Sequence, residues 1–155
     1  MAEPARLTDF AAAEDTLVAI VDWRRWIADE RRSSTHTLAA YSRDLVAFLD
    51  YLRDHLGQPA SLADLEALNV ADFRGFLAQR AGQGIAQSSL ARAMSTLRNF
   101  FRFLDRTGRV ANAAIQVVRA PRPKPPIPKA LAPDEALDMI KAADRLSTTP
   151  WIARR

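Results

Sequence analysis

Apolar residues recur at intervals of three and four along most of the chain, the spacing that gathers them on one face of an α-helix. The clearest run predicts a helix from Ser34, a favourable N-cap, to Leu56, where Gly57 follows. The same spacing predicts helices over residues 16–31, 69–81 and 88–106 and a short helix within 111–117. Tyr41 and Trp23 fall on apolar stripes, so we interpret both as core residues. Because almost no segment alternates with the period of a strand, the pattern predicts an all-α fold of four main helices.

The helical pattern stops at residue 119, where the stretch RAPRPKPPIPKA begins. Its residues include five prolines, four basic residues and no acid. Proline fixes φ and lacks a backbone donor, so residues 119–130 should form an extended, Pro-rich linker. A helical pattern resumes after Pro133. We therefore expect a domain over residues 1–118, a basic linker over 119–130 and the truncated start of a second domain, a helical stub, over 131–155.

The composition excludes several classes of protein. The chain has no cysteine, which rules out a disulfide scaffold and thiolate metal sites and is typical of a reducing compartment. No window approaches the ~18 consecutive apolar residues of a membrane-spanning helix, and the first residues do not form a secretory signal. His36 and His55 have no partner at a metal-ligand spacing. We expect a cytoplasmic protein without membrane insertion, metal or cofactor.

Charge is segregated along the chain. Residues 1–84 carry nine basic and thirteen acidic side chains, whereas residues 85–129 carry nine basic side chains and a single acid, Asp105. Residues 130–155 carry four of each. Positive charge concentrated in this way is typical of a protein that binds a polyanion such as nucleic acid. Charge alone leaves the alternative of a solvated basic surface open.

The polar face of the predicted helix 88–106 carries a row of basic and small polar residues. At about 100° per residue, they fall within an arc of roughly 120°. Like charges so close together destabilise a helix slightly, which favours an anionic partner over plain exposure to solvent. Two serines at the start of the helix add hydroxyl groups where free amides and the helix dipole favour phosphate. The candidate DNA contacts on this helix are Ser88, Ser89, Arg92, Ser95, Arg98, Asn99 and Arg102, with Arg106 continuing the row.

A second candidate surface lies opposite the apolar stripe of the predicted helix 34–56, at His36, Ala40 and Arg43. Small residues let a helix backbone approach a groove wall, and Arg43 could reach a base or a phosphate. A partly exposed alanine face is an equally good interpretation of this pattern. The linker adds the basic candidates Arg119, Arg122 and Lys124.

Three motifs, in order, resemble those of one protein family. SSTHTLAAYSRDLVAF at 33–48 and QSSLARAMSTLRNFFRFL at 87–104 are similar to the two signatures of the core-binding domain of tyrosine recombinases. PIPKALAPDEA at 126–136 resembles the interdomain linker and first catalytic-domain helix of that family. The C-terminal stretch is most similar to the branch that resolves chromosome dimers. Asn112-Ala113 departs from the usual Asn-Pro, a change that does not touch the predicted DNA-facing row.

The resemblance implies a SAM-like core-binding domain whose four main helices pack as two crossed pairs. It implies that helices 34–56 and 88–106 contact adjacent major grooves of one recombination half-site in double-stranded DNA. The family's catalytic residues lie in the domain after the linker, so no residue of this chain is expected to be catalytic and the chain alone should be inactive. The full-length protein would cleave and rejoin DNA through a phosphotyrosine intermediate.

The implied role is site-specific recombination in chromosome dimer resolution and segregation. The implied partners are a dif-like DNA site, a XerD-like recombinase in a heterotetramer on that DNA, and the FtsK translocase. From the residues themselves, two alternatives stay open. One is a stand-alone helical DNA-binding regulator, and the other is a protein-interaction module that binds an acidic partner.

Overall fold

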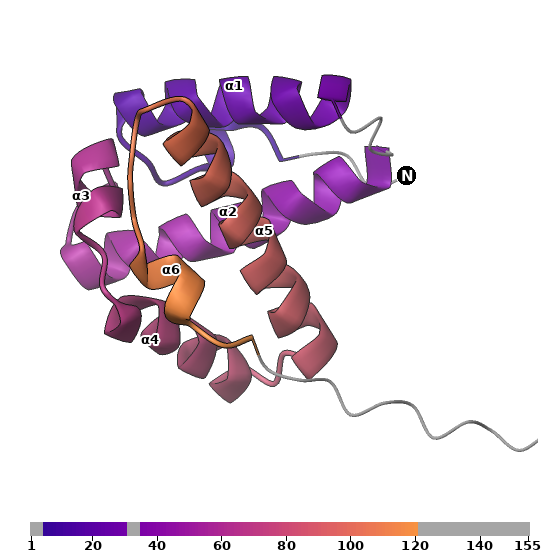
Figure 1. The fold of residues 1–155 in the computed structure, drawn as a ribbon. Coiled ribbons are helices and arrows are strands. Elements are labelled where there is room, and N and C mark those ends of the chain that lie inside the picture. Colours follow the sequence, from indigo (N-terminus) through magenta and orange to yellow (C-terminus); the bar gives the residue numbers. More distant parts are fainter. Residues whose placement is uncertain (1–4, 31–34, 121–155) are drawn as a thin grey trace, which may run out of the picture. The chain divides into compact units, whose positions relative to one another are not determined.

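The computed structural model describes residues 5–30 and 35–120 (Figure 1). The four long helices are α1 (Glu14–Glu30), α2 (Thr35–Leu56), α4 (Val70–Gly82) and α5 (Gln87–Arg106). The short elements are the 3-10 helix η1 (Leu7–Asp9), α3 (Leu62–Ala67) and α6 (Ala114–Val117). The only strand-like pairing in the described ranges is an isolated bridge between Ala12 and Ala60. The predicted all-α fold of four main helices is confirmed.

Part of the prediction concerns residues outside these ranges. The linker beyond residue 120, with Arg122 and Lys124, and the helical stub after Pro133 are not among the described residues. The described residues all belong to one compact unit. The boundaries of a domain over 1–118 and a linker over 119–130 therefore stay predictions.

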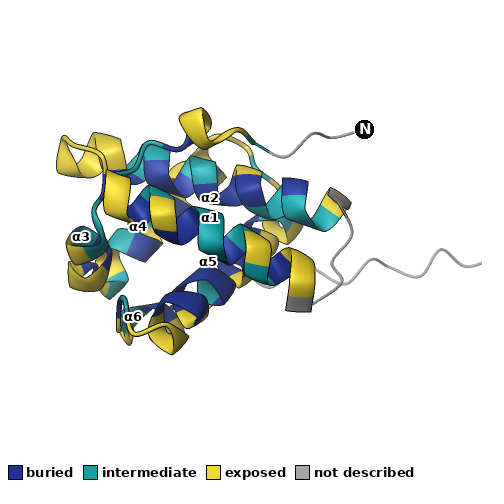
Figure 2. Cartoon of the chain, turned by 90° about the horizontal axis from the view of Figure 1, so that it is seen from above, coloured by how far each residue is buried: buried dark blue, intermediate teal, exposed yellow. Residues whose placement is uncertain are grey.

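Helix α5 lies at the centre of the packing and contacts α1, α2, α4 and α6. Figure 1 shows α5 crossing α2, and α2 in turn contacts α1. The consecutive helices α1 and α2 form one pair and α4 and α5 form the other, which is the expected arrangement of two crossed pairs. Figure 2 shows buried positions along the faces that the long helices turn toward one another.

An aromatic cluster fills the space between the helices. Trp23, Phe48, Phe73 and Phe100 are fully buried. The rings of Phe48 and Phe73 stack with centroids 5.7 Å apart, and those of Trp23 and Phe100 meet edge to face at 5.2 Å. Aromatic pairs of this geometry add about 0.5–1.5 kcal/mol each beyond the burial of their area. The interpretation of Trp23 as a core residue is confirmed.

The connection between α2 and α4, for which the sequence pattern predicts no helix, contains the short helix α3. Gly57, with φ of 76°, ends α2 in the left-handed region as expected. The six-residue α3 follows, a helix that the sequence pattern did not predict. It begins with a capping box. The Ser61 hydroxyl accepts from the Asp64 N–H at 3.2 Å, and the Asp64 carboxylate accepts from the Ser61 N–H at 2.9 Å. This reciprocal pair satisfies two donors at the start of the helix.

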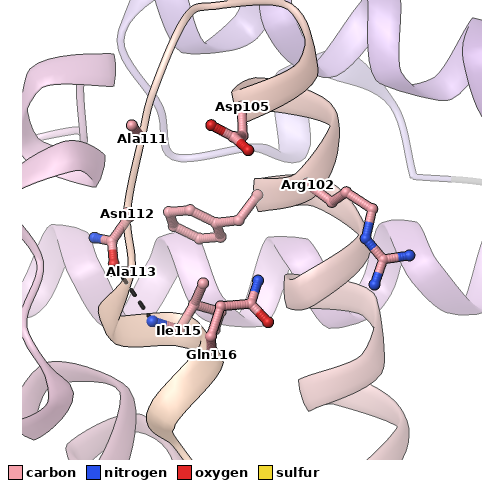
Figure 3. Close-up of a pocket in the computed structure, with 8 residues that line it drawn as sticks. Arg102, Asp105, Ala111, Asn112, Ala113, Ile115 and Gln116 are labelled. Atoms are coloured by element: carbon pink, nitrogen blue, oxygen red, sulfur yellow. Dashed lines mark hydrogen bonds between the residues drawn. The ribbon is translucent and has the colours of Figure 1, made fainter.

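Asn112 joins the corner between α3 and α4 to the segment before α6. Its Nδ2 donates to the carbonyl oxygens of Leu65 and Leu68, both at 2.9 Å, and to a third carbonyl oxygen at 3.2 Å. Its Oδ1 accepts from the N–H groups of Ala114 at 2.9 Å and Ile115 at 3.4 Å, the second of which is drawn in Figure 3. One side chain therefore fixes the position of α6 against the α3–α4 corner.

Candidate nucleic-acid interface

The polar face of α5 places a row of basic and polar side chains at the surface. Arg92, Ser95 and Arg102 are exposed, and Arg98 is half-buried. The first turn of the helix carries no acidic residue. Most of the row that the sequence predicts as a DNA contact is therefore accessible to a large partner.

Asn99 differs from this prediction, because it is buried rather than exposed with the row. It is only 6% exposed, and its Oδ1 accepts a hydrogen bond from Trp23 Nε1 at 2.8 Å. Helix α5 packs against α1 as well as α2, so its buried face is wider than a single apolar stripe and includes Phe100 and Phe103. Asn99 also lines a small hollow at the surface.

That hollow opens between α2 and α5 and has a volume of about 190 Å³. It is lined by Tyr41, Ser95, Arg98, Asn99 and Arg102. Two guanidinium groups, two hydroxyl groups and one amide meet here, and groups of these kinds donate hydrogen bonds to phosphate oxygens. In the structure, Ser95 Oγ donates to the Ala91 carbonyl oxygen at 3.1 Å, so this hydroxyl would have to rotate to reach a phosphate. Within the described residues, the hollow is the feature whose chemistry best suits the DNA backbone.

Packing fixes two of the side chains that line the hollow. Tyr41 is half-buried, and its ring stacks on that of Trp23 with centroids 6.5 Å apart. Arg98 Nη2 donates to the backbone carbonyl oxygen of Val118, which is buried. This bond ties α5 to the residue just before the predicted linker. Tyr41 thus packs on the core, as interpreted from the sequence, and also reaches the candidate site.

Arg92 is held by a carboxylate that the sequence pattern does not single out. Arg92 Nε and Nη2 donate to Asp44 Oδ2 and Oδ1 at 3.0 and 3.1 Å. Thr96 Oγ1 also donates to Asp44 Oδ2, at 3.1 Å. The Asp44 side chain is 5% exposed, whereas that of Arg92 is 46% exposed. The hydrogen bond to Asp44 raises the pKa of Arg92 above its usual range, against the opposing effect of burial, so the guanidinium stays charged.

The remaining predicted contacts do not line the hollow. His36, Arg43, Ser88 and Arg119 are exposed, and Ala40 and Ser89 are half-buried. No side chain caps the start of α5, where Ala86 is the N-cap, so the first amides of the helix stay available to an anion. The structure therefore brings Tyr41 of α2 to the basic row of α5, rather than the predicted residues of α2.

A larger hollow, of about 480 Å³, lies where α5 faces the segment before α6 (Figure 3). Its lining includes Phe101, Asp105, Ile115 and Gln116. Arg102 also lines it, and Figure 3 shows that side chain extending away from the other labelled residues. The mixture of apolar groups with a carboxylate suits a polyanion less well than the hollow beside α2.

In the part of the chain that the structure describes, no three His, Cys, Asp or Glu side chains gather closely enough to hold a metal ion. His55 instead contacts Asp72, with Nε2 and Oδ1 3.2 Å apart. None of the described helices is both long and apolar enough to cross a membrane.

Comparison with known proteins gives one family match and several relatives. The phage integrase N-terminal SAM-like domain matches residues 20–108. Tyrosine recombinase XerC of Rhodospirillum centenum is 40% identical over 146 residues, which cover 94% of this chain and 43% of that protein. XerC of Rhizobium meliloti is 44% identical over 135 residues, which cover 85% of this chain and 42% of that protein. XerC of Brucella suis is 38% identical over 152 residues, which cover 98% of this chain and 46% of that protein. No solved structure matches.

The chain thus spans less than half the length of these curated relatives. The family match, residues 20–108, includes all of α2, α3, α4 and α5 and most of α1. It therefore contains the hollow between α2 and α5 and the pair of Asp44 and Arg92. The resemblance to tyrosine recombinases and the SAM-like fold are confirmed, and the chain belongs to the phage integrase N-terminal SAM-like domain family.

Proposed function

We propose that residues 1–118 form the DNA-binding domain of a XerC-type site-specific tyrosine recombinase. In this proposal, α2 and α5 contact one recombination half-site in double-stranded DNA. The observation that carries it is the hollow between these helices, where Arg98 and Arg102 meet the hydroxyl-bearing Tyr41 and Ser95. Such donors suit the phosphate backbone, which supplies a large share of the affinity in protein–DNA complexes.

The proposal extends to the rest of the chain and to the full-length protein. The basic linker over 119–130 crosses the DNA backbone, where Arg119, Arg122 and Lys124 add phosphate contacts, and residues 131–155 begin the catalytic domain. The full-length protein acts in the cytoplasm, at a dif-like site, with a XerD-like partner in a heterotetramer and with the FtsK translocase. It cleaves and rejoins DNA there and so resolves chromosome dimers before cell division.

The 155-residue chain alone is not expected to cleave DNA. Its only tyrosines are Tyr41 and Tyr51. Tyr41 stacks on Trp23 in the core. Burial and the nearby charge of Asp72 raise the pKa of Tyr51, which makes its hydroxyl group a poorer nucleophile. A suicide duplex, which traps covalent protein–DNA adducts, should give no adduct with this chain.

Fluorescence anisotropy with a short labelled duplex, repeated over a series of salt concentrations, tests the DNA-binding proposal. Arg102→Ala should weaken binding and reduce the slope of log K against log salt by about 0.9, because one phosphate contact fewer releases fewer counterions. Arg53→Ala is the matched control. Arg53 is an exposed arginine of α2 that pairs with Asp50 and Asp54, so its removal should leave the slope unchanged.

Two outcomes contradict the proposed interface. One is the absence of measurable duplex binding by the parent chain. The other is an equal salt slope for the parent chain and Arg102→Ala, with helicity unchanged by circular dichroism. Binding to polyglutamate as tight as binding to DNA would favour a module that recognises an acidic protein.

A further inference from the structure

Arg92 differs from the arginines of the hollow, because Asp44 occupies one edge of its guanidinium group. A guanidinium offers two pairs of parallel donors, one at its side (Nε and Nη2) and one at its end (Nη1 and Nη2). Asp44 accepts from the side pair through both of its carboxylate oxygens. No hydrogen bond joins Nη1 to a described residue, and the side chain is 46% exposed. The end pair is therefore open to a partner outside the domain.

Asp44 holds Arg92 from a buried position between two helices. Asp44 lies on α2, while Arg92 and Thr96 lie one turn apart on α5. Thr96 is fully buried and donates to the same carboxylate. A carboxylate that is itself fixed by a buried hydroxyl fixes the plane of the guanidinium that it binds. The orientation of Arg92 is therefore set when the domain folds, which lowers the entropy lost when a ligand binds.

We propose that Arg92 reads a guanine base in the major groove with its end pair of donors, and that Asp44 is the residue that positions it. This inference rests on the proposed DNA-binding function and adds to it a determinant of sequence specificity. The end pair matches the O6 and N7 acceptors of guanine, and arginine with guanine is the commonest specific contact in the major groove.

Charge distinguishes base reading from phosphate contact at this position. A phosphate attracts positive charge in almost any orientation, and a carboxylate beside the arginine offsets much of that attraction. Asp44 thus makes Arg92 less effective at neutralising a phosphate. What Asp44 contributes instead is a fixed plane, and a planar pair of acceptors on a base edge requires such a plane.

Selection from a library of short duplexes of random sequence tests the inference with the 155-residue chain. Bound duplexes are sequenced after several rounds. We expect the parent chain to enrich a motif with guanine at one position, favoured there by roughly five- to 150-fold over other bases. Arg92→Ala should lose the preference at that position alone, while preferences at other positions remain.

Asp44→Asn tests the positioning role, because it keeps the shape of the side chain and removes its charge. The variant should lose the preference for guanine and yet bind unselected duplex more tightly than the parent chain, since a negative charge near the phosphates is gone. A merely structural role would not give this pair of results, because a damaged fold weakens binding to every sequence. Thr96→Val, which removes only the supporting hydroxyl, should reduce the preference by a smaller factor.

The failures of the two proposals are distinguishable. If Arg92→Ala keeps every base preference and only lowers the salt slope, Arg92 is a phosphate contact and the inference is wrong. If the parent chain binds duplex with no base preference, the inference is wrong and the DNA-binding function stands. If the parent chain does not bind duplex, both fail.

Discussion

The substitution Asn112→Asp keeps the shape of a side chain that joins three elements and removes its two N–H donors. In the parent chain, Nδ2 donates to the carbonyl oxygens of Leu65 and Leu68 at 2.9 Å and of Glu66 at 3.2 Å. The new aspartate retains the oxygen that accepts from the Ala114 N–H. The change therefore isolates the bonds that hold the α3–α4 corner to the segment before α6.

The expected loss of stability follows from these contacts. Two hydrogens serve three carbonyl oxygens, so the variant loses about two full hydrogen bonds, or about 2 kcal/mol. Two of the carbonyl groups belong to Leu65 and Leu68, which are 0% and 6% exposed. Because these carbonyl groups are buried and left without a partner, the cost of each lost bond rises to roughly 1–3 kcal/mol. We expect a loss of about 2–6 kcal/mol at neutral pH, from a total of roughly 6–18 kcal/mol for a domain of this size.

Urea denaturation, followed by circular dichroism at pH about 7 and about 4.5, measures this loss and its pH dependence. The carbonyl dipoles disfavour an ionised carboxylate, so the introduced group has a raised pKa in the folded state. The ionised carboxylate therefore lowers the free energy of unfolding by its full amount above that raised pKa. This destabilisation declines as the pH falls toward the pKa of the unfolded state, about 3.9. Asn112→Ala is the control, because it adds no titrating group and its difference from the parent chain should be the same at both pH values.

The reasoning about Asn112 would be refuted by either of two results. One is a loss below about 1 kcal/mol at neutral pH, the size of an ordinary surface change. The other is a loss for Asn112→Asp that does not decrease in acid.

Two further substitutions test local features. Ser61→Ala should cost about 1 kcal/mol, because it removes the N-cap of α3. Hydrogen bonds from the backbone and hydroxyl of Ser61 lower the pKa of Asp64, so the stabilisation by Asp64 is present at neutral pH and lost as pH falls through that lowered value. In urea titrations, the free energy of unfolding of Ser61→Ala should therefore fall less on acidification than that of the parent chain. The same dependence on pH in both proteins would contradict the pairing of Ser61 with Asp64. At Gly75, an added Cβ would collide with the Tyr51 hydroxyl. Tyr51→Phe removes that hydroxyl. In the Tyr51→Phe protein, Gly75→Ala should therefore gain the full helix propensity of alanine, up to about 1 kcal/mol, whereas in the parent chain the gain should be smaller. A double-mutant cycle measures the difference, and equal effects in both backgrounds would show that the collision is relieved at no cost.

The long helices could be predicted because each buries a stripe that repeats every three or four residues. Leu45, Leu49 and Leu52 of α2 are fully buried, as their spacing predicts. The six-residue α3 has no such stripe, since its buried residue is Leu65 alone. Its start does carry a local signal, because a serine followed three residues later by an acid is the pattern of a capping box. That signal could have predicted a helix between Gly57 and residue 69.

The candidate site was less predictable, because periodicity describes one helix and the site is formed by two. Asp44 and Arg92 are 48 residues apart in the chain, and no local pattern links them. Asn99 falls in the polar arc of α5, yet Trp23 of α1 covers that edge of the helix and bonds its amide oxygen. The exposure of Arg102 followed from the pattern, because a guanidinium is rarely buried without a partner. The contacts between helices did not follow, since they depend on packing in three dimensions.

The central position of α5 has a consequence for how the domain would adapt to its target. Helices α1, α2, α4 and α6 all pack against α5, so it cannot rotate or shift without repacking a dense interior. In the proposed complex, the adjustment of shape therefore falls to the duplex. Bending or twisting DNA is easier at flexible pyrimidine–purine steps than in stiff A-tracts. Base pairs that the protein never touches should thus influence how tightly this domain binds.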